Sequence, residues 1–268
     1  MKLPVFLHRF LGAGAPDDAA REAQIMRRLR FTPMGEFDES DIFVCGWPKS
    51  GNTWCQRLFS GVVWGLDTKV LTDQLAQFLQ PDVHYKPYYY RFGTPTLFKS
   101  HLPPQPEYRR VIFLIRDGRD ALVSYWRMLK KANPQVKIED LFYQGDSLSP
   151  CAWETHARAW LANPFQAKIL TVRYEDILAS PLEQLRRVAS FIRVTRTDDE
   201  LSRIAAGANL EKMKWIAERH GWDNASSAAA QDFLGAGRTG SFREAMPSCI
   251  QEAFQRRAGD TLKQFGYA

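Results

Sequence analysis

The stretch from Asp41 to Gly65 constrains the fold more than any other part of this 268-residue chain. It reads DIFVCGWPKSGNTWCQRLFSGVVWG, and its short apolar run, Ile42–Cys45, predicts a buried strand. A tight polar loop, Pro48–Thr53, comes next, and beyond it apolar residues recur about every three to four positions, as they do in a helix. A strand, a loop of small residues and a helix direct backbone N–H groups and the helix N-terminus at an anion. The stretch therefore predicts a phosphate-binding loop in an α/β fold.

The loop carries its own phosphate-binding chemistry. Lys49 adds a fixed positive charge, and Ser50 and Thr53 add hydroxyl donors. The loop does not match the Walker A pattern G-x-x-x-x-G-K-[ST], because its lysine precedes Gly51 instead of following a glycine. Taken alone, the stretch is compatible with a nucleotide kinase, and that alternative stays open at this point.

Other apolar runs indicate how the rest of the chain is organised. Strand patterns at Leu97–Phe98, Arg110–Ile115 and Lys168–Arg173 alternate with helical patterns. Such alternation predicts a single three-layer α/β/α domain with a central parallel sheet. We expect this domain to span residues 41–268 and residues 1–40 to form an N-terminal arm packed on it, with a helix over Ala20–Phe31.

Composition narrows the classes of partner. The net charge of +6 suits either nucleic acid or a small polyanionic cofactor. Lysine and arginine are spread along the chain, and the signatures of nucleic-acid modules are missing, so we expect no nucleic-acid partner. The four cysteines lack metal-site spacing and are typical of reduced intracellular thiols. The apolar N-terminus is interrupted by Pro4, His8 and Arg9, which predicts neither a signal peptide nor a membrane span and favours a cytoplasmic protein.

The loop PKSGNTW closely resembles the 5′-phosphosulfate loop, usually PKSGTTW, of the sulfotransferases that use PAPS (3′-phosphoadenosine 5′-phosphosulfate). Asn52 stands where the family commonly has Thr, and an asparagine can also donate to a phosphate. The resemblance implies that Lys49 acts in catalysis at the leaving group. It also implies cofactor contacts from Lys49, Ser50, Gly51, Asn52, Thr53 and Trp54.

A second motif, KSHLP, begins at Lys99 and contains His101. The two side chains are two positions apart on a predicted strand end, so they point to the same side of the sheet. In a doubly wound sheet, the carboxyl ends of strands face the ligand crevice. The run resembles the family's K-[ST]-H-L-P motif, which implies that Lys99 contacts the transferring group and that His101 is the catalytic base.

A third motif, RDGRDALVS, runs from Arg116 to Ser124 and resembles the family's 3′-phosphate-binding segment. The resemblance implies that Arg116 and Ser124 hold the 3′-phosphate, and a guanidinium can bind phosphate with two parallel hydrogen bonds. Asp117 and Asp120 are expected to cap the helix that begins here.

The adenine side of the nucleotide site is implied by two further segments. VRYEDILASP resembles the family's RYEDL segment, which places Tyr174 against the adenine-side pocket. Near Gly207, the family usually presents Thr and Phe on either side of adenine, where this chain has Ala208 and Leu210. We expect Leu210 to cover an adenine face by apolar contact, and Trp54 to take a larger share of the stacking.

The glycine-rich run QDFLGAGRTGSFR, from Gln231 to Arg243, resembles the family's RKGxxGDW[KR] loop, which closes over the 3′-phosphate. Gly235 and Ala236 replace the family's Arg-Lys pair. We expect Arg238 to supply the missing charge, together with cofactor contacts from its neighbours Thr239 and Gly240.

The three motifs occur in family order and imply a PAPS-dependent sulfotransferase that transfers a sulfuryl group in line to a hydroxyl or amine of a small molecule. Lysines can balance the charge of a sulfuryl group, so we expect no metal. Aromatic residues over Tyr85–Phe92 and around Phe142 suggest an aromatic or partly apolar acceptor, although they could instead cover the sheet edge. A P-loop-like kinase and a catalytically idle nucleotide-binding protein are the alternatives, and the oligomeric state stays open.

Overall fold

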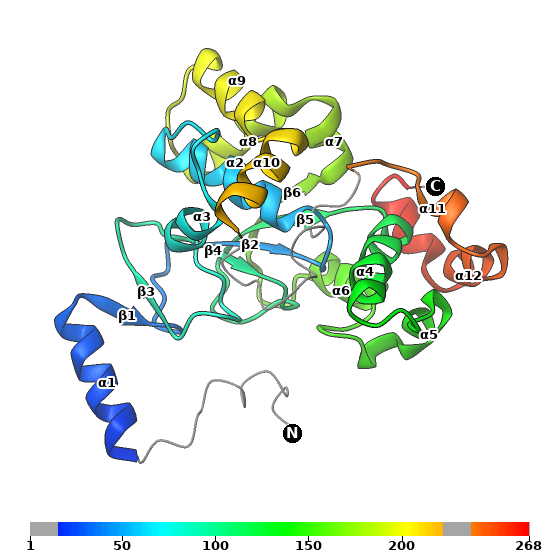
Figure 1. The fold of residues 1–268 in the computed structure, drawn as a ribbon, viewed down its shortest axis with the longest axis horizontal. Helices are drawn as coiled ribbons and strands as arrows, with labels where there is room; N and C mark the ends of the chain where they lie inside the picture. Colours follow the sequence, from blue (N-terminus) through cyan, green and yellow to red (C-terminus); the bar gives the residue numbers. More distant parts are fainter. Residues whose placement is uncertain (1–15, 222–236, 268) are drawn as a thin grey trace.

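A computed structural model describes residues 16–221 and 237–267 of the chain (Figure 1). Its central sheet contains four parallel strands in the order β4-β2-β5-β6. Ile42 pairs with Leu97 on one side and with Arg110 on the other. Since the strands are parallel, their carboxyl ends meet at one edge of the sheet. The strands are β2 (Ile42–Gly46), β4 (Leu97–Ser100), β5 (Arg110–Ile115) and β6 (Lys168–Arg173).

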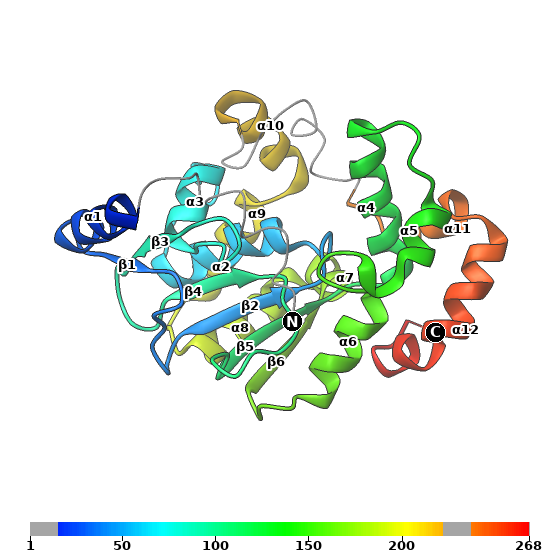
Figure 2. The ribbon, with the colours of Figure 1, turned by 90° about the horizontal axis from the view of Figure 1, so that it is seen from below.

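Side chains that alternate along the strands build two hydrophobic cores, one on each face of the sheet. In β2, Ile42 and Val44 enter one core, whereas Phe43 and Cys45 enter the other. Figures 1 and 2 show helices on both faces. The predicted three-layer α/β/α fold is therefore confirmed. The helices of the first core are α2 (Asn52–Trp64), α8 (Pro181–Ile192) and α9 (Asp198–Gly207), and those of the second are α4 (Gly118–Ala132), α5 (Ile138–Gln144), α6 (Trp153–Ala162) and α12 (Ser248–Gln264).

The helix beginnings explain why α2 is suited to an anion. Asp117 caps α4, as predicted, because its carboxylate accepts a hydrogen bond from the backbone N–H of Arg119 at 2.9 Å. The side chain of Thr197 caps α9 in the same way. In α2, by contrast, the cap position is Gly51, whose φ of 93° is left-handed and which has no side chain to satisfy the first N–H groups. The helices α5, α6 and α8 also lack a side-chain cap, but the start of α2 directly follows the loop at the carboxyl end of β2, where an anion could cap it.

The N-terminal segment meets the domain through a second, smaller sheet. Helix α1 (Pro16–Arg28) ends earlier than the predicted helix, because β1 (Phe31–Pro33) follows and pairs antiparallel with β3 (Tyr88–Tyr90). Figures 1 and 2 place α1 beyond this sheet at one end of the molecule, and most of its side chains are exposed. The division at residue 40 stays a prediction.

The two segments that contain the candidate acceptor aromatics, residues 67–93 and 137–150, contain regular structure. The first includes α3 (Asp73–Leu79) as well as β3, and the second includes α5 and a 3-10 turn, η2 (Gly145–Ser147). The prediction that Phe142 belongs to an acceptor loop is wrong, because its ring is buried in the core beneath the guanidinium of Arg257, 3.8 Å away. The remaining helices are α7 (Tyr174–Ala179), α10 (Leu210–His220) and α11 (Phe242–Ala245). None of the helices described is both long and apolar enough to cross a membrane.

Candidate active site

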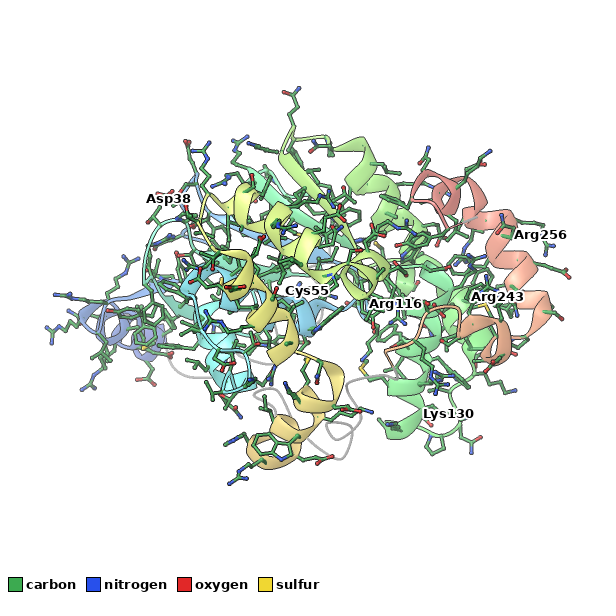
Figure 3. All side chains as sticks on the ribbon, turned by 90° about the horizontal axis from the view of Figure 1, so that it is seen from above. Asp38, Cys55, Arg116, Lys130, Arg243 and Arg256 are labelled. Carbon is green, nitrogen blue, oxygen red and sulfur yellow. The ribbon has the colours of Figure 1, made fainter. Side chains whose placement is uncertain are left out.

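One candidate site residue follows the end of each strand of the central sheet. The loop with Lys49 follows β2, His101 follows β4, Arg116 follows β5 and Tyr174 follows β6. The parallel topology brings all four to the same edge, as the motif positions predicted. In Figure 3, Arg116 lies in the middle of the molecule, between the yellow helices of one layer and the green helix α4 of the other.

The loop after β2 is tightly turned. Lys49 has a φ of 68°, a left-handed conformation that is rare for a residue with a side chain. Its ammonium lies 3.9 Å from the sulfur of Met128 in α4. The sequence suggested that the side chain of Asn52 could donate to a phosphate. In the structure its amide instead donates to the carbonyl of Trp47 at 3.0 Å. Asn52 therefore shapes the loop with its side chain, and its backbone N–H, at the start of α2, is the group directed at an anion.

Lys49 lies in an environment that disfavours its own charge. Burial, together with the nearby charges of Arg116, Lys131 and Lys99, lowers the pKa of Lys49 to about 7. A polyanion bound among these cations would reverse this effect, because it would favour the protonated ammonium. The cluster is therefore arranged for a ligand with several negative charges.

His101 is held as a neutral imidazole with a defined tautomer. Its Nδ1 lies 2.7 Å from the carbonyl oxygen of Gly46 at the end of β2, and a carbonyl can only accept, so Nδ1 carries the proton. Nε2 is then left with a lone pair. Burial and the charge of Lys99, partly opposed by Asp82, together lower the pKa of His101 to about 3. The ring is therefore neutral at rest, and its Nε2 carries the lone pair.

Lys99 has a partner that the sequence did not reveal. Its ammonium forms an ion pair with the carboxylate of Asp82, with a distance of 3.0 Å between Nζ and Oδ2. Both side chains are buried. Burial alone would raise the pKa of Asp82, but the charge of Lys99 and the hydrogen bond from the backbone N–H of His84 help to hold it below its ordinary value. The carboxylate form of Asp82 is therefore favoured beside the ammonium of Lys99.

Arg116, Tyr174 and Trp54 form one wall beside the loop. The guanidinium of Arg116 lies 4.5 Å from the centre of the Tyr174 ring. The rings of Tyr174 and Trp54 meet edge to face, 5.5 Å apart, and the indole N–H of Trp54 donates to the carbonyl of Ala208 at 2.7 Å. A Cβ on Gly51 would lie only 2.6 Å from the Tyr174 ring, so the loop and this wall are in close contact. Flat aromatic surfaces beside a cationic loop suit a nucleotide.

Asp120 anchors a distant loop and does not cap α4, so its predicted role is corrected. Its carboxylate accepts hydrogen bonds from the backbone N–H groups of Gly240 and Phe242, at 2.6 and 2.9 Å, and from the hydroxyl of Ser241 at 3.0 Å. Arg116 donates to the carbonyls of Lys49 and Arg238, at 3.1 and 3.0 Å. The segment after Gly237 is thereby tied to both the loop and α4.

The other predicted cofactor residues lie in α4, in α10 and in the segment after Gly237. The side chains of Arg238 and Thr239 are exposed, and Gly240 has a φ of 75°. Ser124 lies half-buried in α4, and Leu210 is the first residue of α10. The first part of the predicted loop, residues 231–236, lies outside the described residues and includes Gly235 and Ala236.

Unsatisfied polar atoms at the site test whether a polyanionic nucleotide fits. The hydroxyl of Ser50 and the Nε of Arg116 are buried and have no hydrogen-bond partner among the residues that the structure describes. Both are donors and both belong to predicted phosphate-binding motifs. These atoms, together with the uncapped start of α2, fit phosphate groups. Within residues 16–221 and 237–267, acidic, histidine and cysteine side chains form no cluster suited to a metal ion.

The residues that the sequence missed are Asp82, His84 and the anchoring role of Asp120. Asp82 and His84 are two positions apart, as are Lys99 and His101, and this spacing is the one signal that could have paired them. The first-turn position of Asp120 is the same for a cap and for an anchor, so the sequence could not separate the two roles.

Known structures share this fold. The crystal structure of retinol dehydratase in complex with androsterone and the inactive cofactor PAP superposes with a TM-score of 0.65 and 18% identity over 86% of this chain and 82% of that one. A mouse sulfotransferase complexed with PAP gives a TM-score of 0.61 at 17% identity, over 86% of this chain and 88% of that one. At these identities the likeness establishes the fold alone.

Sequence relatives and a family profile establish the family to which the chain belongs. An amine sulfotransferase from rabbit, Oryctolagus cuniculus, is 25% identical over 257 residues, which cover 86% of this chain and 83% of the relative. A flavonol sulfotransferase-like protein from Flaveria bidentis is 27% identical over 61% of this chain and 60% of its own length. The sulfotransferase domain profile matches residues 39–266, which is most of the chain. The chain therefore belongs to the sulfotransferase domain family.

Proposed function

We propose that this protein transfers a sulfuryl group from PAPS to a hydroxyl or amine of a small-molecule acceptor, with His101 as the general base. The observation that carries the proposal is the hydrogen bond from Nδ1 of His101 to the carbonyl of Gly46, at 2.7 Å. It leaves the lone pair of Nε2 at the same sheet edge as the phosphate-binding loop. A general base needs both this neutral form and this position.

The residues at the sheet edge divide between the two ends of the proposed cofactor. Lys49, the Ser50 hydroxyl and the uncapped start of α2 would hold the 5′-phosphosulfate. Arg116, with one unsatisfied N–H, would bind the 3′-phosphate together with Ser124. Tyr174 and Trp54 would face the adenine.

The same assignment leaves supporting roles for the 3′-phosphate loop and α10. Arg238 would add charge near the 3′-phosphate, beside Thr239 and Gly240. Leu210, as the first residue of α10, would approach the base.

In the proposed step, each residue has one task. PAPS supplies the sulfuryl group: a bond forms between the acceptor oxygen or nitrogen and sulfur, the bond from sulfur to the 5′-phosphate oxygen breaks, and 3′,5′-bisphosphoadenosine (PAP) leaves with the electron pair. Nε2 of His101 takes the proton of the acceptor. Lys49 stabilises the negative charge on the leaving oxygen, and Lys99 stabilises the sulfuryl oxygens.

Two alternatives are weaker. A P-loop-like kinase would need the Walker A order of glycine and lysine, which the loop lacks. A catalytically idle nucleotide-binding protein would not need a neutral histidine with a fixed tautomer beside two lysines. A transfer of labelled sulfate from PAPS that continues in the presence of a metal chelator separates all three functions.

The surroundings of His101 support an aromatic or partly apolar acceptor. Tyr85 is half-buried and its ring centre lies 6.3 Å from that of His84, and the ring of Tyr125 packs edge to face on Trp47, 5.5 Å apart. Tyr90 and Phe92, which the sequence also suggested, pack instead on Phe78 and Trp64 around β3. An aromatic acceptor is in keeping with the flavonol-named relative, and an amine acceptor with the rabbit one.

The unpaired state of all four cysteines is in keeping with a cytoplasmic site of action.

The test is the substitution His101→Ala, assayed with PAPS against a panel of phenolic, alcoholic and amine acceptors. We expect turnover to fall by about 10² or more while PAP binding is retained. His220→Ala is the matched control, because His220 is exposed in the last turn of α10. Unchanged turnover in His101→Ala, from an active wild-type protein, would rule out the assignment of the base.

A further inference from the structure

The segment Pro81–His84 runs beside β4 as an additional edge of the central sheet. The backbone N–H of Lys99 donates to the carbonyl of Pro81 at 2.9 Å, and the N–H of Val83 donates to the carbonyl of Lys99 at 3.0 Å. Asp82 and Lys99 therefore stand opposite each other as a parallel bridge. The backbone thus fixes a carboxylate directly beside the lysine of the second motif.

In this arrangement the carboxylate of Asp82 is buried between Lys99 and His84. Its side chain has no exposed surface, and that of Lys99 is 6% exposed. One carboxylate oxygen lies 3.0 Å from the ammonium of Lys99, and the other accepts a hydrogen bond from the backbone N–H of His84 at 2.9 Å. A buried lysine without such a partner would lose its proton or its fixed position. Asp82 supplies both the charge and the direction that Lys99 needs.

His84 holds the catalytic histidine in a corresponding way. Its Nε2 accepts a hydrogen bond from the backbone N–H of His101 at 3.0 Å, so Nε2 of His84 is unprotonated. The two rings are nearly parallel, with an angle of 18° and centres 5.7 Å apart. His101 is thereby fixed at two points, its backbone N–H by His84 and its Nδ1 by Gly46.

We propose that Asp82 and His84 are positioning residues for sulfuryl transfer, which act through Lys99 and His101 without touching the reacting atoms. This inference rests on the proposed function. Catalytic groups gain most when their positions are fixed before the reaction, because no free energy is then spent on ordering them in the transition state. A lysine side chain otherwise has considerable rotamer freedom to lose.

A double-mutant cycle tests the role of Asp82. Asp82→Asn should lower kcat by roughly 10-fold or more, and Lys99→Ala should do so as well. In the Lys99→Ala background, Asp82→Asn should cost no more than about 2-fold, because the residue through which Asp82 acts is gone. Equal losses from Asp82→Asn in both backgrounds would overturn the proposal. Asp82→Glu should recover part of the loss, since it restores the carboxylate.

The matched control is Asp41→Asn. Asp41 is likewise a buried, ion-paired carboxylate, held by Arg91 at 2.8 Å, but it lies just before β2 at the opposite end of the strands. Both substitutions should lower the melting temperature, and only Asp82→Asn should lower kcat. A loss of kcat that follows melting temperature in both variants would mean that Asp82 is merely structural.

PAP binding separates failure of this inference from failure of the proposed function. PAP has no sulfuryl group for Lys99 to contact, so Asp82→Asn should bind PAP within about 3-fold of the wild-type protein. If the wild-type protein binds PAP but transfers sulfate to no acceptor, the proposed function fails. If the wild-type protein is active and Asp82→Asn keeps its kcat, only the positioning role fails.

The role of His84 is tested by a pair of substitutions. His84→Gln keeps a side-chain oxygen that can accept from the backbone N–H of His101, and His84→Leu removes the acceptor. We expect kcat to fall by roughly 10-fold in the leucine variant and to recover at least in part in the glutamine variant. Equal activity in the two variants would remove His84 from the proposal.

Discussion

The carboxylate of Asp120 accepts a hydrogen bond at 2.6 Å from the backbone N–H of Gly240, a residue 120 positions later in the chain. Two more hydrogen bonds, from Ser241 and Phe242, complete the contact, and Asp120 is almost wholly buried. Through this contact, helix α4 holds the segment that includes Arg238 next to Arg116. The proposed site for the 3′-phosphate therefore depends on a residue that we do not expect to touch the phosphate.

Asp120→Ala is the first prediction. Loss of the carboxylate leaves two backbone N–H groups and a hydroxyl without their partner, so the segment after Gly237 should lose its fixed position. We expect the KM for PAPS and the Kd for PAP to rise by roughly 10-fold, with a smaller change in kcat. Asp140→Ala is the control, because Asp140 is an exposed carboxylate in the first turn of α5. Equal effects in the two variants would contradict the anchoring role.

The second prediction concerns proton uptake by Lys49. Because the pKa of Lys49 is lowered to about 7 by burial and neighbouring cations, roughly nine-tenths of the ammonium is deprotonated at about pH 8. A bound polyanion raises this pKa, so PAP binding at that pH should take up close to one proton. Calorimetry in two buffers of different ionisation enthalpy measures the uptake. Lys49→Met should bind PAP more weakly and without that proton, and equal uptake in both proteins would contradict the assignment.

The strand-end residues could be predicted from the sequence because the positions of the strands and their parallel arrangement determine where these residues lie. Apolar runs identify the parallel strands, and the parallel arrangement places Lys49, His101 and Arg116 at one edge. The motif resemblance then supplies their roles. None of this requires knowledge of which distant segments pair.

The residues that were missed or misassigned depend on long-range pairing. Asp82 contributes to the site only because its segment aligns with β4, and no local pattern marks that alignment. The aromatic residues around Phe142 suggested an acceptor site, yet Arg257 from α12 covers the Phe142 ring in the core. In each case a contact between segments, rather than the residue's own propensity, decided the role.

The third prediction uses the close contact between Gly51 and Tyr174. An alanine at position 51 would place its Cβ 2.6 Å from the ring and would have to adopt a φ of 93°. The ring should shift away from Arg116 and Trp54, and PAP affinity should fall by roughly 10-fold or more. Gly35→Ala is the matched control, because Gly35 has a φ of 107° but no atom within 4 Å of the added Cβ. We expect it to lower stability by about 1 kcal/mol and to leave PAP affinity unchanged.

The fourth prediction is that acid destabilises the fold through His156. This side chain is fully buried in α6, where its Nε2 lies 3.3 Å from both the indole nitrogen of Trp160 and the carbonyl oxygen of Leu102, and burial lowers its pKa to about 4. The neutral form is favoured in the folded state, so its contribution is present above the ordinary pKa near 6.5 and is lost as the pH falls toward 4. Between about pH 7 and about pH 5, this loss amounts to about 2 kcal/mol of unfolding free energy. Urea denaturation of His156→Phe should show a pH dependence that is shallower by this amount, whereas the exposed His220→Gln should follow the wild-type protein; an unchanged slope in His156→Phe would mean that other groups carry the acid sensitivity.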